Sequence, residues 1–264
     1  MKIDLNSDLG ESFGAYCMGN DSSVLENLSS ANVACGFHAG DPLVMERTVQ
    51  QAAEKGVAVG AHPGFPDLLG FGRREMACKP DEVYAYCLYQ IGALAAICRS
   101  KGISLQHVKA HGALYNMAAR DPVLAEAIAF ATRDAAPDLI LMGLANSIFS
   151  EAAVRAGVIF AAEAFADRAY RNDGSLLPRS EKGAVIHDPE EASRRVIRMV
   201  TTGSVTSIDG TEISIYPDSI CLHGDTPEAV QMSFVIREKL LEAGIVICDL
   251  REILSGRHKS CSSL

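Results

Sequence analysis

The sequence predicts an α/β fold, a single deformed (β/α) barrel of seven strands. Short apolar runs alternate with helical patterns along the whole chain, which is typical of a parallel sheet covered by helices. Five of the helical patterns begin with a proline. The chain has 264 residues without a Ser/Gly-rich linker or a shift in composition, and barrels of about 250 residues commonly form one domain.

Seven runs rich in Val, Ile, Leu and Ala have the length of buried strands. Right-handed crossovers between successive parallel strands would order these runs around a barrel. The regular barrel of this class has eight strands, so seven indicate a distorted or incomplete one. The predicted strands are residues 2–7, 31–35, 57–62, 106–110, 139–145, 158–164 and 219–223.

The five helices are predicted from a shared start signal, a capping or polar residue followed by a proline in the first turn. In the first helix, apolar residues recur at helical spacing up to a stop at Gly56, and the second reaches Lys101. The other three are expected at 123–134, 190–202 and 228–243. The start pairs are Asp41–Pro42, Lys79–Pro80, Asp121–Pro122, Asp188–Pro189 and Thr226–Pro227.

One domain is expected over residues 1–256, followed by a flexible tail at 257–264. Two long loops, 62–79 and 167–187, are punctuated by Gly and Pro and follow strand ends. They are expected either to overhang the mouth of the barrel as lids or substrate clamps, or to be plain surface connections.

Composition excludes several classes of function. Lys and Arg number 24 against 33 Asp and Glu, a net charge of -9, and no segment concentrates basic residues with interleaved aromatics, so nucleic acid is not an expected partner. The chain shows no signal-peptide core, and its most apolar region, 139–164, is interrupted by polar residues, so no membrane span is expected. Its eight cysteines show no C-x-x-C pair, which predicts reduced thiols and a cytoplasmic location.

Polar clusters follow the ends of most predicted strands. Because the carboxyl ends of parallel strands meet at one edge, their side chains should converge on one mouth. Asp4, Asn6 and Asp8 should share one face of their strand, as should Lys109 and His111. The other candidates at strand ends are Glu11, His38, Asp41, His62, Glu163, Asp167, Arg168, His223 and Asp225, whereas His107, His187 and His258 lie at element starts or in the tail.

Some candidates admit two interpretations. Lys109 is a charge within an apolar strand, which is costly unless it pairs with a carboxylate or an anionic substrate, and the alternative is a solvated rim. Glu11 could approach the mouth or cap the following turn. Glu163, Asp167 and Arg168 could form a clamp in which the arginine binds a substrate carboxylate, or a structural ion pair.

Three chemistries could use these residues. Asp and His ligands, with Asp8, His38 and His62 as candidates, could hold a divalent metal that activates water for amide hydrolysis. Alternatively, Lys109 and the histidines could stabilise a phosphoryl group during ATP-dependent activation of an amide, with carboxylates holding Mg²⁺. No P-loop motif is present. A carbohydrate-binding or small-acid-binding protein is the non-enzyme alternative.

Six stretches together resemble the LamB/YcsF family, the A subunits of bacterial 5-oxoprolinase. The resemblance runs in unbroken order from residue 2 to about residue 245. It includes Asn32 as a further binding residue. The stretches are residues 4–11, 31–41, 60–67, 108–115, 163–170 and 221–225.

This resemblance implies an ATP-hydrolysing enzyme that opens the lactam of 5-oxo-L-proline to L-glutamate, in a complex with two further subunits, B and C. It also implies a fold similar to the deformed seven-stranded barrels of the glycoside hydrolase/deacetylase superfamily. From their strand-end placement, Lys109 and His111 are expected to stabilise the phosphoryl group or oxyanion, and Asp8 or His62 to position water. Arg168 is expected to hold the substrate carboxylate, and the remaining candidates to bind substrate or nucleotide.

Overall fold

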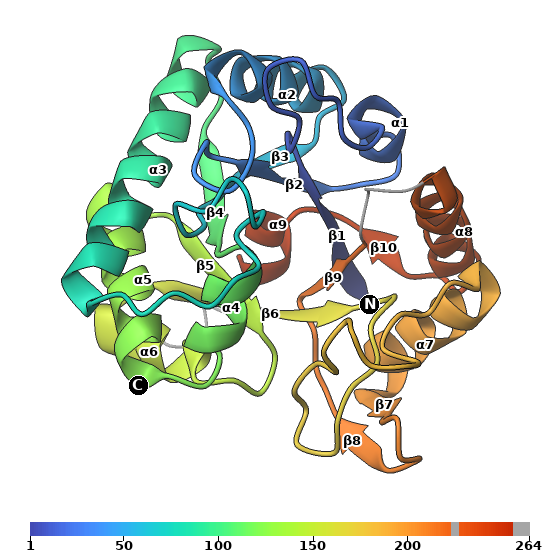
Figure 1. The fold of residues 1–264 in the computed structure, drawn as a ribbon. Helices are drawn as coiled ribbons and strands as arrows, with labels where there is room; N and C mark the ends of the chain where they lie inside the picture. The colour runs from blue at the N-terminus through green and yellow to red at the C-terminus, as the bar shows by residue number, and fades with distance from the viewer. Residues whose placement is uncertain (223–226, 256–264) are drawn as a thin grey trace.

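The computed structural model describes residues 1–222 and 227–255 and confirms the barrel. Seven strands run parallel in chain order, and the last of them pairs with both β6 and β1, which closes the sheet (Figure 1). The closure is irregular, because the register shifts between β3 and β4 and the last strand has only three residues. The barrel strands are β1 (Lys2–Leu9), β2 (Ser30–Ala34), β3 (Ala58–His62), β4 (Leu105–Lys109), β5 (Ile140–Leu144), β6 (Ile159–Phe165) and β9 (Ser219–Cys221).

Helices form the outer layer around these strands (Figure 1). The five helices predicted from their proline starts are confirmed: α2 (Pro42–Glu54), α3 (Pro80–Ser100), α5 (Pro122–Ala135), α7 (Pro189–Thr202) and α8 (Pro227–Glu242). Asp41, Asp121 and Asp188 each accept hydrogen bonds from two backbone N–H groups of the helix that follows. The short helices were not predicted: α1 (Asp21–Leu25), α4 (Gly112–Ala118), α6 (Phe149–Ala156) and α9 (Leu250–Leu254).

The two faces of the barrel wall carry different residues. Outward side chains such as Leu5, Val33 and Val59 are fully buried and belong to one large hydrophobic cluster with residues of the helices. Burying a side chain of this size stabilises the fold by about 1.5–3 kcal/mol, so this layer holds the helices on the strands. The alternate side chains point inward, and many of them are polar.

Helix α9 closes the end of the barrel where the strands begin. Its Leu250 and Leu254 pack on Ile140 and Met142, whose register partners on β4 are the inward-facing His107 and Lys109. Arg251 of the same helix donates a hydrogen bond of 3.0 Å to the carbonyl oxygen at the start of β4. The strand before α9, β10 (Val246–Ile247), adds to the first residues of β1. Neither element was predicted.

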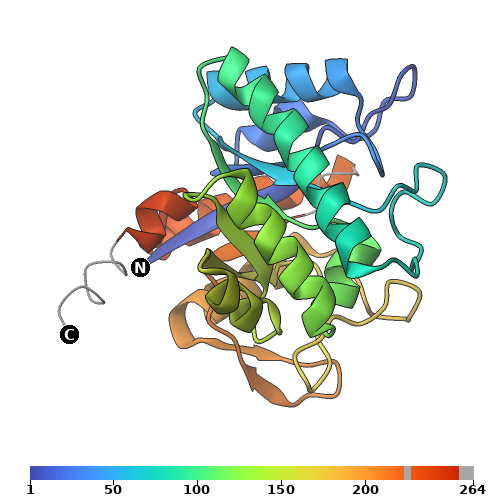
Figure 2. The ribbon, with the colours of Figure 1, turned by 90° about the vertical axis from the view of Figure 1, so that its left-hand side faces the viewer.

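The loops gather at the opposite end. Figure 2 shows α9 and the N-terminus at one end of the barrel and the long loops projecting from the other. An antiparallel hairpin of β7 (Ser204–Thr206) and β8 (Glu212–Ser214) lies outside the barrel and was also not predicted. Within residues 1–222 and 227–255, none of the helices has the length and apolarity needed to cross a membrane.

Candidate active site

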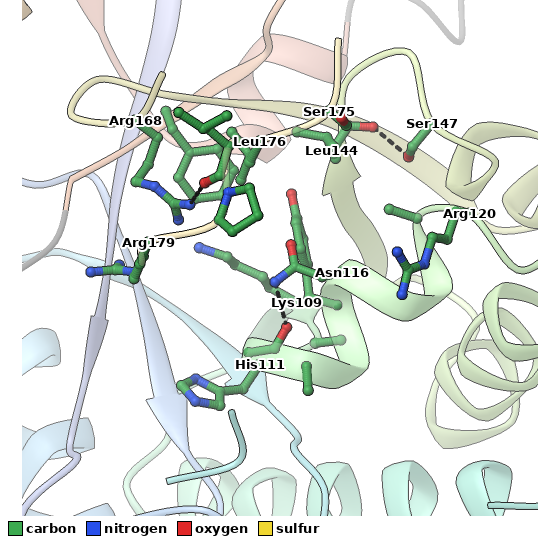
Figure 3. Close-up of a pocket in the computed structure, with 18 of the residues that line it drawn as sticks. Lys109, His111, Asn116, Arg120, Leu144, Ser147, Arg168, Ser175, Leu176 and Arg179 are labelled. Atoms are coloured by element: carbon green, nitrogen blue, oxygen red, sulfur yellow. Dashed lines mark hydrogen bonds between the residues drawn. The ribbon is translucent and has the colours of Figure 1, made fainter. Parts of the chain in front are cut away.

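A cavity of about 560 Å³ opens at the carboxyl ends of the strands. Predicted site residues that line it are Asp8, Glu11, His62, Lys109, His111 and Arg168. In Figure 3, Lys109 and His111 project from the end of β4 and the start of α4, while Arg168 and Arg179 come from the loop after β6. The predicted convergence of residues that are distant in the sequence therefore holds for these six.

Lys109 lies at the centre of the site, between two carboxylates. Its Nζ is 2.7 Å from Glu163 Oε1, 3.0 Å from Asp8 Oδ1 and 3.3 Å from Asn6 Oδ1. Burial alone would lower the pKa of Lys109, but the negative charges of Asp8 and Glu163 hold it well above its ordinary value. The ammonium group of Lys109 therefore stays positively charged. Lys109 forms a buried ion pair with these carboxylates and does not lie in a solvated rim.

Glu163 is held in place by two further donors. Tyr115 of α4 donates a hydrogen bond of 2.7 Å from its hydroxyl to Oε2, and Asn6 donates one of 3.0 Å to Oε1. Asn32 in turn donates to Asn6 Oδ1 at 2.7 Å and to Asp8 Oδ1 at 2.9 Å. Asn6 and Asn32 thus lie below the cavity and orient the residues that reach it.

Next to Lys109, two histidines face each other. His62 Nδ1 is 2.7 Å from the carbonyl oxygen of Lys109, and His111 Nε2 is 2.8 Å from that of Phe71. Their remaining nitrogens, His62 Nε2 and His111 Nδ1, are 3.0 Å apart. Asp8 Oδ2 lies 3.3 Å from the same His62 Nε2, which joins the histidines to the lysine pair.

His38 and Glu11 complete a four-residue group with these histidines. The ring of His38 stacks on that of His111 at 3.7 Å between centroids, with an interplanar angle of 5°. Glu11 Oε1 is 3.7 Å from both His38 Nε2 and His111 Nδ1, so Glu11 approaches the mouth rather than capping a turn. Burial lowers the pKa of His111 to about 3 and that of His38 well below its ordinary value, so both rings are neutral near pH 7.

The loop 62–79 packs closely against these rings. Gly72 has a φ of +63°, and a Cβ there would lie 2.7 Å from His38 Cβ and 2.8 Å from His111 Cδ2. Glycine suits this position on both counts, because it tolerates positive φ and leaves room for the rings. Loop 62–79 therefore covers the histidines and is more than a plain surface connection.

Arginines from the loop after β6 also line the cavity. Arg168 is mostly buried and donates a hydrogen bond of 2.6 Å to the carbonyl oxygen of Leu177, but its Nε has no hydrogen-bond partner among the described residues. Burial and the neighbouring Arg179 lower the pKa of Arg168 to about 10. A planar guanidinium in this position suits a carboxylate or phosphate.

Other predicted residues lie elsewhere. Asp4 is inside the barrel below the cavity, accepts hydrogen bonds from Ser29, Ser30 and Ser219, and has a pKa raised to about 6 by burial. Asp41 caps α2. Glu163 pairs with Lys109 rather than forming one clamp with Asp167 and Arg168, and Asp167 is buried outside the residues that line the cavity. His223 and Asp225 lie outside the described residues.

Sequence reasoning missed two residues that support the site. His107, set aside as an element start, points into the barrel, and its Nε2 is 2.7 Å from Asn32 Oδ1. Its position two residues before Lys109 on the same strand was the available signal. Tyr115 lies four residues after His111, but α4 is too short for its periodicity to reveal a shared face.

A closed (β/α) barrel with a buried lysine, carboxylates and neutral histidines at the carboxyl ends of its strands belongs to the class of barrels that carry active sites at this end. The chain belongs to the LamB/YcsF family, whose model matches residues 3–255.

Relatives are similar over nearly the whole chain. The A subunit of the 5-oxoprolinase of Alkaliphilus metalliredigens is 53% identical, covering 96% of this chain and 99% of that protein. The corresponding protein of Heliobacterium modesticaldum is 55% identical, covering 94% and 97%. A crystal structure of a lactam utilization protein from Thermus thermophilus matches with a TM-score of 0.90 at 50% identity, covering 94% and 99%.

A more distant structural match concerns the fold alone. A peptidoglycan deacetylase from Bacillus subtilis superposes with a TM-score of 0.51 at 12% identity, covering 98% of this chain and 94% of that one. This agrees with the expected similarity to deacetylase barrels.

Proposed function

We propose that this chain is one component, the A component, of a 5-oxoprolinase, which opens the lactam of 5-oxo-L-proline to L-glutamate. The relatives named above support this activity, and the observation that carries its chemistry is the buried Lys109. Its charge is held at the cavity wall between Asp8 and Glu163, beside two neutral histidines.

An unstrained lactam resists water, because amide resonance must be lost and a poor amine leaving group expelled. We propose that ATP, with Mg²⁺, phosphorylates the carbonyl oxygen of the ring. ATP leaves as ADP. Water then adds to the ring carbon, the ring C–N bond breaks as the nitrogen takes up a proton, and a second water hydrolyses the resulting acyl phosphate to the glutamate carboxylate and free phosphate. The chain has no P-loop, so we assign this step to a complex with two further subunits, B and C, working in the cytoplasm.

The roles of the side chains follow from their positions. Lys109 stabilises the negative charge that develops on the carbonyl or phosphoryl oxygen, and a well-placed donor of this kind contributes roughly 3–4 kcal/mol to catalysis. Asp8, whose Oδ2 is 3.3 Å from His62 Nε2, is placed to orient water and accept its proton. Arg168, which lines the same cavity as Lys109, provides a guanidinium for the carboxylate of the substrate.

One assay tests the proposal. Glutamate and phosphate release from 5-oxo-L-proline and ATP is measured with the purified chain alone and then with candidate B and C subunits. We expect both products only from the complex, in equal amounts. Turnover by the chain alone without ATP would instead support a stand-alone amidohydrolase, and ligand binding without turnover in any mixture would support a binding protein.

A further inference from the structure

We propose that Glu11, His38, His62 and His111 form a binding site for one divalent transition-metal ion such as Zn²⁺. One carboxylate oxygen and three imidazole nitrogens of these residues all lie within 4.8 Å of one another. They come from segments far apart in the sequence: the ends of β3 and β4 and the loops that follow β1 and β2. The proposal concerns ion binding and stands independently of the lactam reaction.

The first argument is the contact between His62 and His111. A carbonyl oxygen can only accept, so His62 Nδ1 and His111 Nε2, which face carbonyls at 2.7 and 2.8 Å, each carry a proton. The other two ring nitrogens, His62 Nε2 and His111 Nδ1, therefore point at each other across 3.0 Å. A cation between them, whether a proton or a metal ion, would be shared by both nitrogens.

The same carbonyl contacts are those that orient histidine ligands. A metal-binding histidine usually donates its other N–H to a carbonyl or carboxylate, which fixes the tautomer and the ring direction. His62 and His111 both have this arrangement before any ion is bound. The site is thus preorganised at two of its four ligands.

The second argument comes independently from His38. Its side chain is 0% exposed, yet neither ring nitrogen has a hydrogen-bond partner among the residues that the structure describes. Leaving a buried polar group unsatisfied costs about 1–3 kcal/mol, so a native protein needs a reason for it. An ion in the group supplies that reason. Because His38 stacks flat on His111, its ring must turn partly out of the stack to ligate.

The donor set indicates the kind of ion. Imidazole suits Zn²⁺, Fe²⁺ and Ni²⁺, whereas Mg²⁺ and Ca²⁺ take oxygen ligands, so this site differs in chemistry from a site for Mg²⁺–ATP. Zinc bonds of about 2.0–2.1 Å in tetrahedral geometry separate neighbouring donors by about 3.4 Å. The observed separations of 3.0 and 3.7 Å lie on either side of this value.

The ion would also be accessible. Glu11, His62 and His111 line the cavity, so an ion among them would face the same space as Lys109. A bound divalent ion would supply a Lewis acid at the cavity wall.

The test measures binding without turnover. The full chain is stripped with a chelator and titrated with Zn²⁺ against a chromophoric competitor, and its bound metal is counted by mass spectrometry. We expect about one equivalent, and roughly a 100-fold weaker affinity or more in His111→Gln and Glu11→Gln. His187→Gln, an exposed histidine outside the group, is the matched control and should bind like the parent protein.

Two measurements keep the result decisive. Co²⁺ in place of zinc should give tetrahedral ligand-field bands without the charge-transfer band of a thiolate, which separates this site from the free cysteines. Glu11 lies in a loop, so Glu11→Gln tests the site even where a histidine variant fails to fold. Absence of stoichiometric binding, unchanged affinity in Glu11→Gln, or a thiolate spectrum would each overturn the proposal.

Discussion

Two adjacent groups of polar side chains at the mouth of the barrel differ in whether their buried polar atoms have partners. The lysine network (Lys109, Asp8 and Glu163) is internally complete, because the ammonium group has a carboxylate on each side within 3.0 Å. The histidine cluster (Glu11, His38, His62 and His111) turns two ring nitrogens toward each other at 3.0 Å and leaves one ring, that of His38, without hydrogen bonds among the described residues. The lysine network needs no further binding partner, whereas the histidine cluster is the site that we propose for a metal ion.

The largest expected effect comes from breaking the lysine network. Lys109→Met leaves the buried Glu163 and the partly exposed Asp8 without their cation, and removal of one partner from a buried ion pair costs about 3–5 kcal/mol. We expect unfolding at a lower urea concentration and a loss of turnover by orders of magnitude in the reconstituted complex.

A charge-compensated variant separates stability from catalysis. Lys109→Met combined with Glu163→Gln removes one charge of each sign, so we expect it to recover much of the stability while turnover stays low. Near-normal turnover in either variant would remove Lys109 from the mechanism.

The second prediction uses a histidine that is buried but hydrogen-bonded, in contrast to His38. Burial lowers the pKa of His107 to about 3 from its ordinary 6.5. Below pH 6.5 the unfolded chain therefore binds a proton at His107 that the folded chain does not bind. The free energy of unfolding falls as a result while the pH decreases from 6.5 towards 3.

Between pH 6.5 and 4.5 this histidine should account for roughly 2–3 kcal/mol of lost stability. Urea unfolding of His107→Gln across this range should show a shallower dependence on pH by about one proton, whereas the exposed His187→Gln should follow the parent protein. Parallel curves for all three proteins would contradict the effect of burial on this ring.

A third variant tests Arg168, an arginine that lines the same cavity as both groups. Arg168→Lys keeps the charge but loses the planar fork, and we expect KM for 5-oxo-L-proline to rise about 10- to 100-fold with a smaller change in kcat. Arg198→Lys, whose ion pair with Glu212 lies outside the barrel, is the matched control. An unchanged KM in Arg168→Lys would assign the substrate carboxylate to another residue.

The smallest effect is expected at Asp41. It was predicted to bind substrate or nucleotide, but the structure uses its carboxylate as the cap of α2 and as an acceptor for the Gly14 N–H. Asp41→Ala should cost about 1 kcal/mol of stability in thermal unfolding, as other lost caps do, and leave KM unchanged. A large rise in KM would instead indicate that Asp41 binds substrate or nucleotide.

The two groups also differ in how far the sequence reveals them. Strands and proline-started helices are local signals, so the barrel and the strand-end positions of Lys109, His62 and His111 were predicted correctly. The contacts within each group were not, because the pairing of Lys109 on β4 with Asp8 on β1 depends on how the sheet curves into a barrel. Short helices such as α4, which carries Tyr115, are stabilised by tertiary packing and leave little periodicity.

His107 illustrates the same limit from within a strand. Its ring occupies space beside Gly60 of β3, where a Cβ would come within 2.0 Å of Nε2. A polar residue in an apolar run indicates an inward direction only when the register of the neighbouring strand is known. That register follows from packing and not from the local sequence.

Helix α9, which closes the end of the barrel where the strands begin, limits the routes by which molecules can reach the cavity. Because Leu250 and Leu254 fill the far end, the residues that the structure describes leave the cavity open only past the loops, where whatever enters would also leave. Reactant and product would share a single doorway, so a protein that docks over these loops would govern admission and departure together.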